Sequence, residues 1–275
     1  METKNLVVEP ETPGNKLYTF AYLEDPNLGA RKTMEDFTIV QPTLTPDHAW
    51  GLFVILDGHG GSHIAEETKR IYPNILKTLL LAHKEQQDIL SLINESINQL
   101  LDKLRQTKDM DCGSTFCGLL INSVTKTYYS INIGDSSLIS VRAIEGPEGP
   151  ANLEAVALTE EHKVTNPQEK ERIKAANGLM NNRVGGQLLV TRAIGDFAFG
   201  SYGLTATPDI REHALGREKF LFVGSDGVWD AVNHEQLVDM LKANGHKSVA
   251  EITKELVDDA KTKSIDNISL IVLKF

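Results

Sequence analysis

The sequence predicts a layered α+β fold, and the grouping of its apolar patterns leads to that prediction. Short runs of β-branched and aromatic residues gather before residue 57 and again between about 115 and 158, while helical patterns separate and follow these blocks. Strands and helices that come in separate groups favour helices on the faces of antiparallel sheets over regular strand-helix alternation. With 275 residues and 41% hydrophobic content, the chain can bury a full core as one domain.

The first block contains three expected strands. Residues 17–23 and 37–41 flank a polar turn, which favours a hairpin. Residues 50–56 are apolar without alternation, so we expect this strand to be buried on both faces. The remaining strands are expected at 115–122, 127–133, 138–141, 153–158, 220–224 and 268–273.

Helical spacing of apolar residues extends from 62 to about 105 and predicts two long antiparallel helices. Asn166 is an N-cap candidate followed by Pro167, and this pair predicts a short helix that Gly178 ends. Two amphipathic helices are expected at 236–244 and 248–261. The two helix pairs can therefore cover both faces of a sheet sandwich.

Residues 1–16 are polar, and we expect them to form a flexible lead-in to a single domain at 17–275. The N-terminus has no apolar secretory core, and no apolar run reaches the length of a membrane span. Cys112 and Cys117, the two cysteines, suggest neither a disulfide scaffold nor a zinc cluster. These features predict a cytoplasmic protein, with a nuclear location also open.

The charge balance excludes some classes of partner. There are 28 basic and 38 acidic residues, and the difference is a net charge of −10. Such a charge argues against unspecific binding to nucleic acid or to anionic membranes. It fits a solvated acidic surface and a protein that holds divalent cations equally well, so charge alone does not decide the function.

Three aspartates stand beside predicted strands: Asp57, Asp226 and Asp266. A glycine follows the first two, and a single Asp-Gly pair is best explained as an ordinary turn. Three such acids next to buried strands favour a shared metal site, because Mg2+ and Mn2+ prefer carboxylate, carbonyl and water oxygens. Gly58 lets its backbone approach a cation closely, so the Gly58 carbonyl is a further candidate ligand.

Four neighbouring residues have chemistry that suits phosphate-ester hydrolysis. Glu35 and Asp36 can hold metal-bound waters, although a solvated turn explains them equally well. His59 is a candidate general acid because an unperturbed imidazole has a pKa of about 6.5, and a polar turn histidine is the alternative. Arg31 can clamp a phosphoryl group with a forked pair of hydrogen bonds, unless it is simply a solvated surface arginine.

Seven motifs in a fixed order carry a family resemblance. They are Arg31-x-x-Met34-Glu35-Asp36, Asp57-Gly58-His59-Gly60-Gly61, Gly113-Ser114-Thr115, Gly134-Asp135-Ser136, Thr191-Arg192-Ala193-Ile194-Gly195-Asp196, Ser225-Asp226-Gly227-Val228-Trp229-Asp230 and Asp266-Asn267-Ile268-Ser269. Each motif is weak alone, but the ordered set is specific, and the resemblance that it carries covers residues 17–275. The sequence resembles the type 2C, metal-dependent protein serine/threonine phosphatases.

The resemblance implies a four-layer α-β-β-α sandwich of two antiparallel sheets flanked by helix pairs. It implies hydrolysis of phosphoserine and phosphothreonine in protein substrates by direct attack of a water that bridges two Mg2+ or Mn2+ ions, without a phosphoenzyme. A weaker third cation is a further implication. We expect a monomer that acts on phosphorylated proteins and binds neither nucleic acid nor membranes.

The resemblance also assigns roles by position. Asp57 bridges both cations, Asp226 and Asp266 bind one of them, the Gly58 carbonyl binds the other, and Glu35 acts through water. Asp135, together with Asp226, corresponds to the third site, and Asp36 and Asp230 lie beside the centre without binding cations directly. Arg31 holds the phosphate, and His59 protonates the departing oxygen.

A mobile flap beside the cleft is implied at about 159–190, where family members diverge and where substrate choice is expected to depend. The chain departs from the common family pattern at Val164, where proline usually follows His-Lys, and at Gly224, where alanine is frequent. Neither residue is an expected ligand.

Three alternative functions make different demands on the sequence. A binding module derived from the same fold would lack cation ligands, whereas Asp57, Asp226 and Asp266 are present. A haloacid-dehalogenase-like phosphatase would need Asp-x-Asp at the first strand end, where this chain has Asp57-Gly58-His59. A Ca2+-binding structural protein would favour a compact loop of alternating acids, which the sequence lacks.

Overall fold

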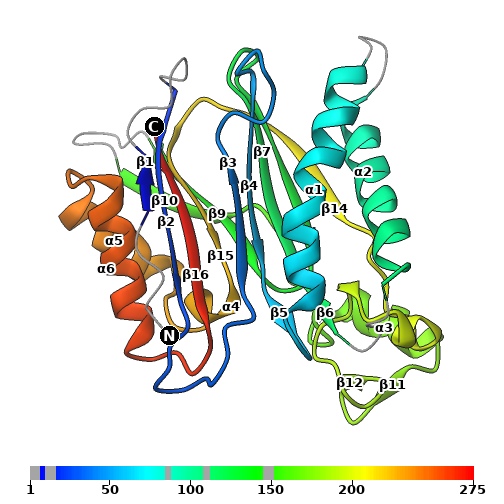
Figure 1. The fold of residues 1–275 in the computed structure, drawn as a ribbon. Helices are drawn as coiled ribbons and strands as arrows, with labels where there is room; N and C mark the ends of the chain where they lie inside the picture. The colour runs from blue at the N-terminus through cyan, green and yellow to red at the C-terminus, as the bar shows by residue number, and fades with distance from the viewer. Residues whose placement is uncertain (1–6, 10–16, 84–87, 108–111, 145–151) are drawn as a thin grey trace.

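The computed structural model describes residues 7–9, 17–83, 88–107, 112–144 and 152–275. They form four layers, with a pair of helices on the outer face of each of two sheets (Figure 1). The α-β-β-α sandwich expected from the resemblance is therefore confirmed. Within the described residues, no helix combines the length and apolar character that a membrane crossing requires.

The first sheet has six strands, and all of its neighbouring strands are antiparallel. In spatial order they are β1 (Val7–Glu9), β2 (Thr19–Asp25), β16 (Ile268–Lys274), β15 (Glu218–Gly224), β9 (Ser137–Ile144) and β10 (Asn152–Ala157). Helices α5 (His234–Asn244) and α6 (Val249–Lys261) cover its outer face.

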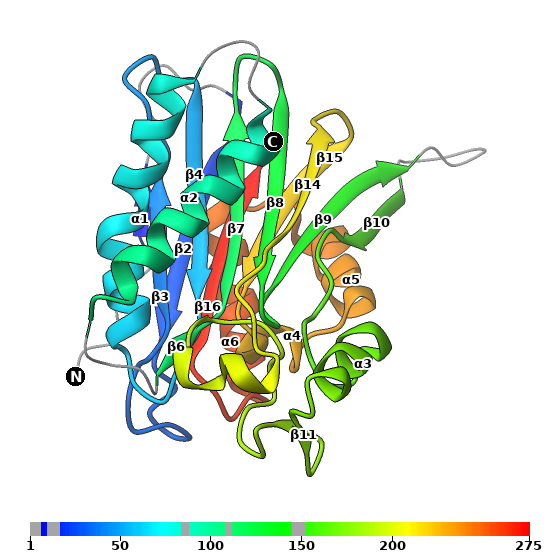
Figure 2. The same ribbon diagram turned by 90° about the vertical axis from the view of Figure 1, so that its right-hand side faces the viewer.

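The second sheet has five strands, again all antiparallel. Their order is β14 (Asp209–Ala214), β8 (Thr127–Ile133), β7 (Phe116–Asn122), β4 (Trp50–Leu56) and β3 (Phe37–Gln41). Helices α1 (His63–Ala82) and α2 (Ile89–Leu104) lie side by side on its outer face (Figure 2).

Smaller elements gather at one end of the sandwich (Figure 1). Three short strands form a third sheet, in the order β13 (Ile194–Gly195), β6 (Gly113–Ser114) and β5 (Gly58–His59). The other elements are α3 (Pro167–Ala175), the hairpin of β11 (Leu179–Met180) and β12 (Arg183–Val184), the 3-10 helix η1 (Phe197–Tyr202) and the single turn α4 (Asp226–Trp229).

Strand β4 contributes side chains to two apolar clusters, one on each of its faces. Leu52, Val54 and Leu56 pack against α1 and α2, while Phe53 and Ile55 point into the apolar cluster between the sheets. All five side chains are fully buried. The expectation that an unbroken apolar run is buried on both faces is confirmed, because a central strand of a four-layer sandwich has no solvent-exposed face.

The expected hairpin between residues 17–23 and 37–41 is wrong. Strand β2 pairs with β16 in one sheet, and β3 pairs with β4 in the other, so the chain crosses between sheets in residues 26–36. A polar segment between two strands fits a crossover as well as a tight turn. Glu24 on β2 ties the two strands together across the layers, because its Oε1 accepts hydrogen bonds from the Thr38 amide at 2.8 Å and the Thr38 hydroxyl at 3.0 Å.

Two further expectations need correction. Within the expected flexible lead-in, residues 7–9 form β1 at the edge of the six-stranded sheet, and the rest of the lead-in lies outside the described residues. Strand β14 was not expected, because Asp-Ile-Arg-Glu-His-Ala alternates too weakly to resemble a strand. It is an edge strand of half-buried and exposed residues. Its backbone pairing with β8, rather than its own sequence pattern, holds it in the sheet.

Phe53 tests the core between the sheets. The Phe53 ring is fully buried and makes edge contacts with Tyr18 at 5.7 Å and Phe20 at 5.3 Å between ring centroids. Phe53→Ala should lower the free energy of unfolding by about 3–5 kcal/mol, since the cavity cannot close between two sheets. Denaturant titration measures this, and Val124→Ala at an exposed turn should change it by less than about 0.5 kcal/mol. A Phe53→Ala value as small as the control would contradict the layered core.

Candidate metal centre

The three strand-end aspartates meet at one end of the sandwich. Asp57 follows β4, Asp226 begins α4 directly after β15, and Asp266 precedes β16. They line a single cleft of about 420 Å3. The cleft is also lined by five of the other expected site residues, namely Arg31, Glu35, Gly58, His59 and Asp135.

The two acids expected beside the centre do not line this cleft. Asp36 is buried, with 2% of its surface exposed, and its charge acts on Asp57 through the protein interior. Asp230 is exposed and follows the α4 turn, from which its charge acts on Asp226. Neither acid therefore lies at the surface of the cleft.

The backbone of Asp57 is fixed by a threonine. The Asp57 amide donates to Thr115 Oγ1 at 3.0 Å, and the Thr115 amide donates to the Asp57 carbonyl at 2.9 Å. The hydroxyls of Thr115 and Ser136 are hydrogen-bonded at 2.8 Å. Thr115 therefore holds Asp57 at the strand end, a role that the sequence motif did not reveal.

Gly58 has no room for a side chain. A Cβ atom there would lie 2.5 Å from the Glu35 carbonyl oxygen, which accepts a hydrogen bond from the Gly58 amide at 3.2 Å. The close approach brings the crossover segment that carries Glu35 against the end of β4. Besides the close approach to a cation that the sequence predicts, packing thus also requires glycine at this position.

Asn267 anchors the same crossover segment from the other sheet. Its Oδ1 accepts from the Glu35 amide at 3.0 Å, and its Nδ2 donates to the carbonyls of Pro26 at 2.8 Å and Thr33 at 2.9 Å. Asn267 was part of a sequence motif without an assigned role. Among the described residues, the backbone of the crossover segment has no neighbouring strand to pair with, and the Asn267 side chain supplies hydrogen bonds to it instead. Asn267 is buried, with 5% of its surface exposed.

The carboxylates of the centre repel one another. Burial raises the pKa of Asp57 well above its ordinary value, and the charges of Asp36 and Asp226 raise it further. Burial raises the pKa of Asp36 to about 7, with Asp226 adding to the shift. Burial raises the pKa of Asp226 to about 6, and Asp135 contributes repulsion. Bringing these acids together costs free energy that a divalent cation would offset.

The donor set fits hard cations. Asp226 Oδ1 and Asp36 Oδ2 are buried, and neither finds a hydrogen-bond partner among the described residues. In the same part of the chain, no three His, Cys, Asp or Glu side chains converge into one chelate. Carboxylate, backbone carbonyl and water oxygens are the ligands that hard cations such as Mg2+ and Mn2+ prefer, so the residues at this cleft fit such ions.

His59 is held by an acid far along the chain. His59 Nε2 lies 2.5 Å from Asp196 Oδ2, and the Asp196 side chain is 1% exposed. Gly113 makes room for the pair, because a Cβ there would lie 2.1 Å from Asp196 Oδ2 and 2.7 Å from His59 Nε2. Asp196 closes the motif of residues 191–196, but no local pattern indicated that it orients the histidine.

Two acids of the centre are paired with basic side chains. Arg31 Nη2 forms an ion pair with Asp266 Oδ2 at the rim of the cleft, where the arginine side chain is 51% exposed. Lys163 Nζ lies 3.2 Å from Asp135 Oδ2. Arg31 therefore contacts an expected metal ligand. The Asp135 carboxylate forms an ion pair with Lys163 at the place where the resemblance implies a third cation.

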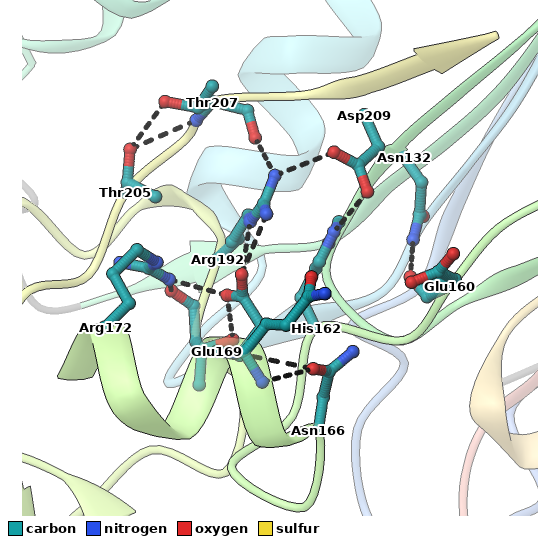
Figure 3. Close-up of polar contacts among 12 residues, drawn as sticks. Asn132, Glu160, His162, Asn166, Glu169, Arg172, Arg192, Thr205, Thr207 and Asp209 are labelled. Atoms are coloured by element: carbon teal, nitrogen blue, oxygen red, sulfur yellow. Dashed lines mark hydrogen bonds and ion pairs between the residues drawn. The ribbon is translucent and has the colours of Figure 1, made fainter. Parts of the chain in front are cut away.

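The expected flap segment is fastened by a network of charged groups (Figure 3). Arg192 pairs with Glu169 on α3 at 2.8 Å and with Asp209 on β14 at 3.1 Å. Asp209 Oδ2 lies 3.2 Å from His162 Nε2, and His162 Nδ1 accepts from the Gly134 amide at 3.1 Å. The network thus connects α3 to the loop that carries Asp135.

The charges of this network are strongly stabilised. Burial raises the pKa of Glu169, but hydrogen bonds from Arg192, Arg172 and Thr191 outweigh it and lower the pKa to about 2. The carboxylate of Glu169 therefore remains ionised at any ordinary pH.

Both departures from the family pattern have structural counterparts. Val164 is buried in a small apolar cluster formed by side chains of the expected flap and of residues 193–204. At Gly224 a Cβ would lie 2.7 Å from Trp229 Nε1, which donates to the Gly224 carbonyl at 3.1 Å. Glycine lets the indole close over the end of β15.

The fold and this cleft together define a phosphatase of the α-β-β-α sandwich class, and sequence comparisons identify the family. A sequence model of the protein phosphatase 2C family matches residues 22–268. The chain is 31% identical over 269 residues to "Probable protein phosphatase 2C 45" of Oryza sativa subsp. japonica, covering 95% of this chain and 89% of that protein. It is 33% identical to "Probable protein phosphatase 2C 8" of Arabidopsis thaliana, covering 90% and 76%. The chain belongs to the protein phosphatase 2C family, and it is a protein serine/threonine phosphatase.

Solved structures agree on the fold. Serine-threonine phosphatase 2C from Toxoplasma gondii superimposes with a TM-score of 0.76 at 21% identity, over 98% of each chain. A sex determining protein of C. elegans superimposes with a TM-score of 0.81 at 20% identity, over 94% of this chain and 64% of that one.

The carboxylate cluster predicts a link between cations, pH and stability. Since the pKa values of Asp226 and Asp36 rise in the fold, to about 6 and about 7, their stabilising contribution is fully present below the ordinary value of 3.8 and is lost as pH rises through these values. Mn2+ or Mg2+ at about 100 times its dissociation constant should add about 2.7 kcal/mol near pH 8. The gain should be much smaller near pH 5.5.

Thermal unfolding in EDTA and in Mn2+ measures this effect. Asp57→Asn should raise the melting temperature of the metal-free protein near pH 8 and remove most of the Mn2+ response. A Mn2+ response that is equal at both pH values, or that survives in Asp57→Asn, would show that the cations bind elsewhere.

Proposed function

We propose that this phosphatase uses two Mg2+ or Mn2+ ions to hydrolyse phosphoserine and phosphothreonine directly, without a phosphoenzyme. The buried, mutually repelling carboxylates around one cleft are the observation that carries the proposal, because this arrangement is unfavourable without cations. A cytoplasmic or nuclear location and a monomeric state stay predictions.

In this proposal each acid has a distinct task. Asp57 bridges the two cations, Asp226 and Asp266 bind one, and the Gly58 carbonyl binds the other. Glu35 acts through water, since its Oε2 already accepts from the Gly61 amide at 3.3 Å. When bound, two cations lower the pKa of the attacking water and neutralise charge on the phosphoryl oxygens.

Asp135 is the least suited of the proposed ligands. Its carboxylate is paired with Lys163, so a third cation would have to displace or share with the ammonium group. Asp36 and Asp230 do not bind the cations directly, and their charges act on Asp57 and Asp226, respectively.

Arg31 and His59 handle the substrate in this proposal. Arg31 stands half-exposed at the rim, where its planar guanidinium can turn from Asp266 to two phosphoryl oxygens. His59 gives a proton to the departing serine or threonine oxygen. The buried Asp196 carboxylate orients the imidazole, as a carboxylate does beside a catalytic histidine.

The alternative functions fit less well. A binding module without catalysis would need the cation ligands to be missing, whereas Asp57, Asp226 and Asp266 line one cleft. An aspartyl-nucleophile phosphatase would need a second acid where His59 stands, and His59 is instead held by Asp196.

The direct test is hydrolysis of a phosphothreonine peptide in EDTA, Mg2+ or Mn2+, with inhibitors of the okadaic-acid type present. We expect turnover with either cation and none in EDTA. Asp57→Asn should lower kcat/KM by on the order of a thousandfold, because cation binding supplies several kcal/mol of transition-state stabilisation. Turnover in EDTA, or near-normal turnover of Asp57→Asn, would refute the two-cation proposal.

The role of His59 depends on the leaving group. His59→Ala should slow hydrolysis of an alkyl phosphoester by about a hundredfold, the usual contribution of a general acid. An aryl ester with a good leaving group needs no proton and should lose far less. Parallel kinetics on the two esters measure the difference, and equal losses would exclude His59 as the acid.

A further inference from the structure

The active cleft has a wall made by the flap. Besides the metal-centre residues, Arg183, Gln187, Leu188, Leu189, Val190 and Phe199 line the same 420 Å3 space. The hairpin β11–β12 lies at the end of the sandwich where β5 and β6 also lie (Figure 1). A peptide whose phosphate enters the centre therefore brings its neighbouring residues against this wall.

Arg183 is held in place on this wall. It lies on β12, and its Nη1 donates to the Gln187 carbonyl at 2.6 Å. The turn between them uses Gly185 and Gly186 at φ values of 57° and 77°. A Cβ on Gly185 would lie 2.9 Å from the Phe199 ring, so the turn needs glycine for conformation and for space.

Among the described residues, no carboxylate neutralises the charge of Arg183. Among the described residues that line the cleft, Arg31 and Arg183 are the two that carry a positive charge. Arg31 pairs with Asp266, whereas Arg183 has no carboxylate within 4 Å in the described part of the chain. Five acids line the same cleft, namely Glu35, Asp57, Asp135, Asp226 and Asp266.

An apolar side chain stands on the same wall. Leu189 is 52% exposed although it lines the cleft. Its uncovered surface would gain from contact with the backbone or an apolar side chain of a bound peptide. The wall thus presents the Arg183 guanidinium, which has no carboxylate partner among the described residues, and the apolar side chain of Leu189.

Building on the proposed function, we propose that Arg183 selects phosphoprotein segments with an anionic side chain flanking the phosphorylated residue. The anion is a carboxylate or a second phosphate, since both match the guanidinium fork. Elsewhere in this acidic cleft such a group would be repelled, so Arg183 favours substrates that place it at the flap.

The test compares phosphothreonine peptides that differ at the flanking positions: aspartate, asparagine, lysine or phosphoserine. The wild type should prefer the aspartate or phosphoserine peptide over the asparagine peptide by about fivefold in kcat/KM, the size of an exposed ion pair. Arg183→Gln should remove this preference, and Arg183→Glu should reverse it toward the lysine peptide. High salt should weaken the preference in the wild type.

Lys174→Gln is the matched control. Lys174 lies on α3 of the same flap, is exposed, pairs with Glu171 and does not line the cleft. Lys174→Gln removes one positive charge, as Arg183→Gln does, and should keep the wild-type preference among the peptides. If the peptides are hydrolysed equally well by the wild type, or if Arg183→Gln keeps the wild-type ratios, the proposal is overturned.

Two readouts separate this proposal from the proposed function. A small aryl phosphate has no flanking residue, so Arg183→Gln should lose more activity on the aspartate peptide than on the aryl phosphate. If neither substrate is hydrolysed by the wild type with Mn2+, the proposed function fails. If both are hydrolysed without flanking preference, the function stands and the assignment of Arg183 fails. A preference for phosphoserine alone would assign the site to a second phosphate.

Discussion

Electrostatic repulsion among buried aspartates is the constraint on which the rest of the site depends. Asp57, Asp36 and Asp226 each have a raised pKa because burial and neighbouring acids disfavour their ionised forms. Rigid supports keep the acids from moving apart, and Thr115 and Asn267 supply them through hydrogen bonds to the backbone on both sides of the cleft. The repulsion among these carboxylates lowers the stability of the fold at this end of the sandwich, and a bound cation would restore it.

The two-sheet architecture is what brings the acids together. Strand β4 belongs to the five-stranded sheet, whereas β15 and β16 belong to the six-stranded sheet, and each sheet packs against its own helix pair. The crossover of residues 26–36 then carries Arg31 and Glu35 to the same place. A hairpin there would have left both residues at the edge of one sheet. The correction to the expected topology is therefore also what places Arg31 at the cleft.

Strong local patterns made most of the fold predictable. The apolar runs of β3, β4 and β8 gave their observed bounds, and the Asn166-Pro167 start signal placed α3. Pairing partners are not encoded locally, which is why the hairpin was wrong and the polar strand β14 was missed. The acids and Gly58 were found by motif, whereas the contact of His59 with Asp196 joins residues 137 positions apart and exists only in the fold.

In the two proposals, the two arginines that line the cleft have different tasks: Arg31 serves catalysis and Arg183 serves substrate selection. Arg31 is paired with Asp266, and in the proposed function it contacts the phosphoryl group that every substrate shares. Arg183 stands on the β11–β12 hairpin of the expected flap, and the ion pair of Arg192 with Glu169 fastens the same segment. Because the anchor and the cleft wall use different residues, the wall can change its charge without disturbing the metal centre. A flap fastened by buried ion pairs is thus a stable frame on which substrate preference can vary.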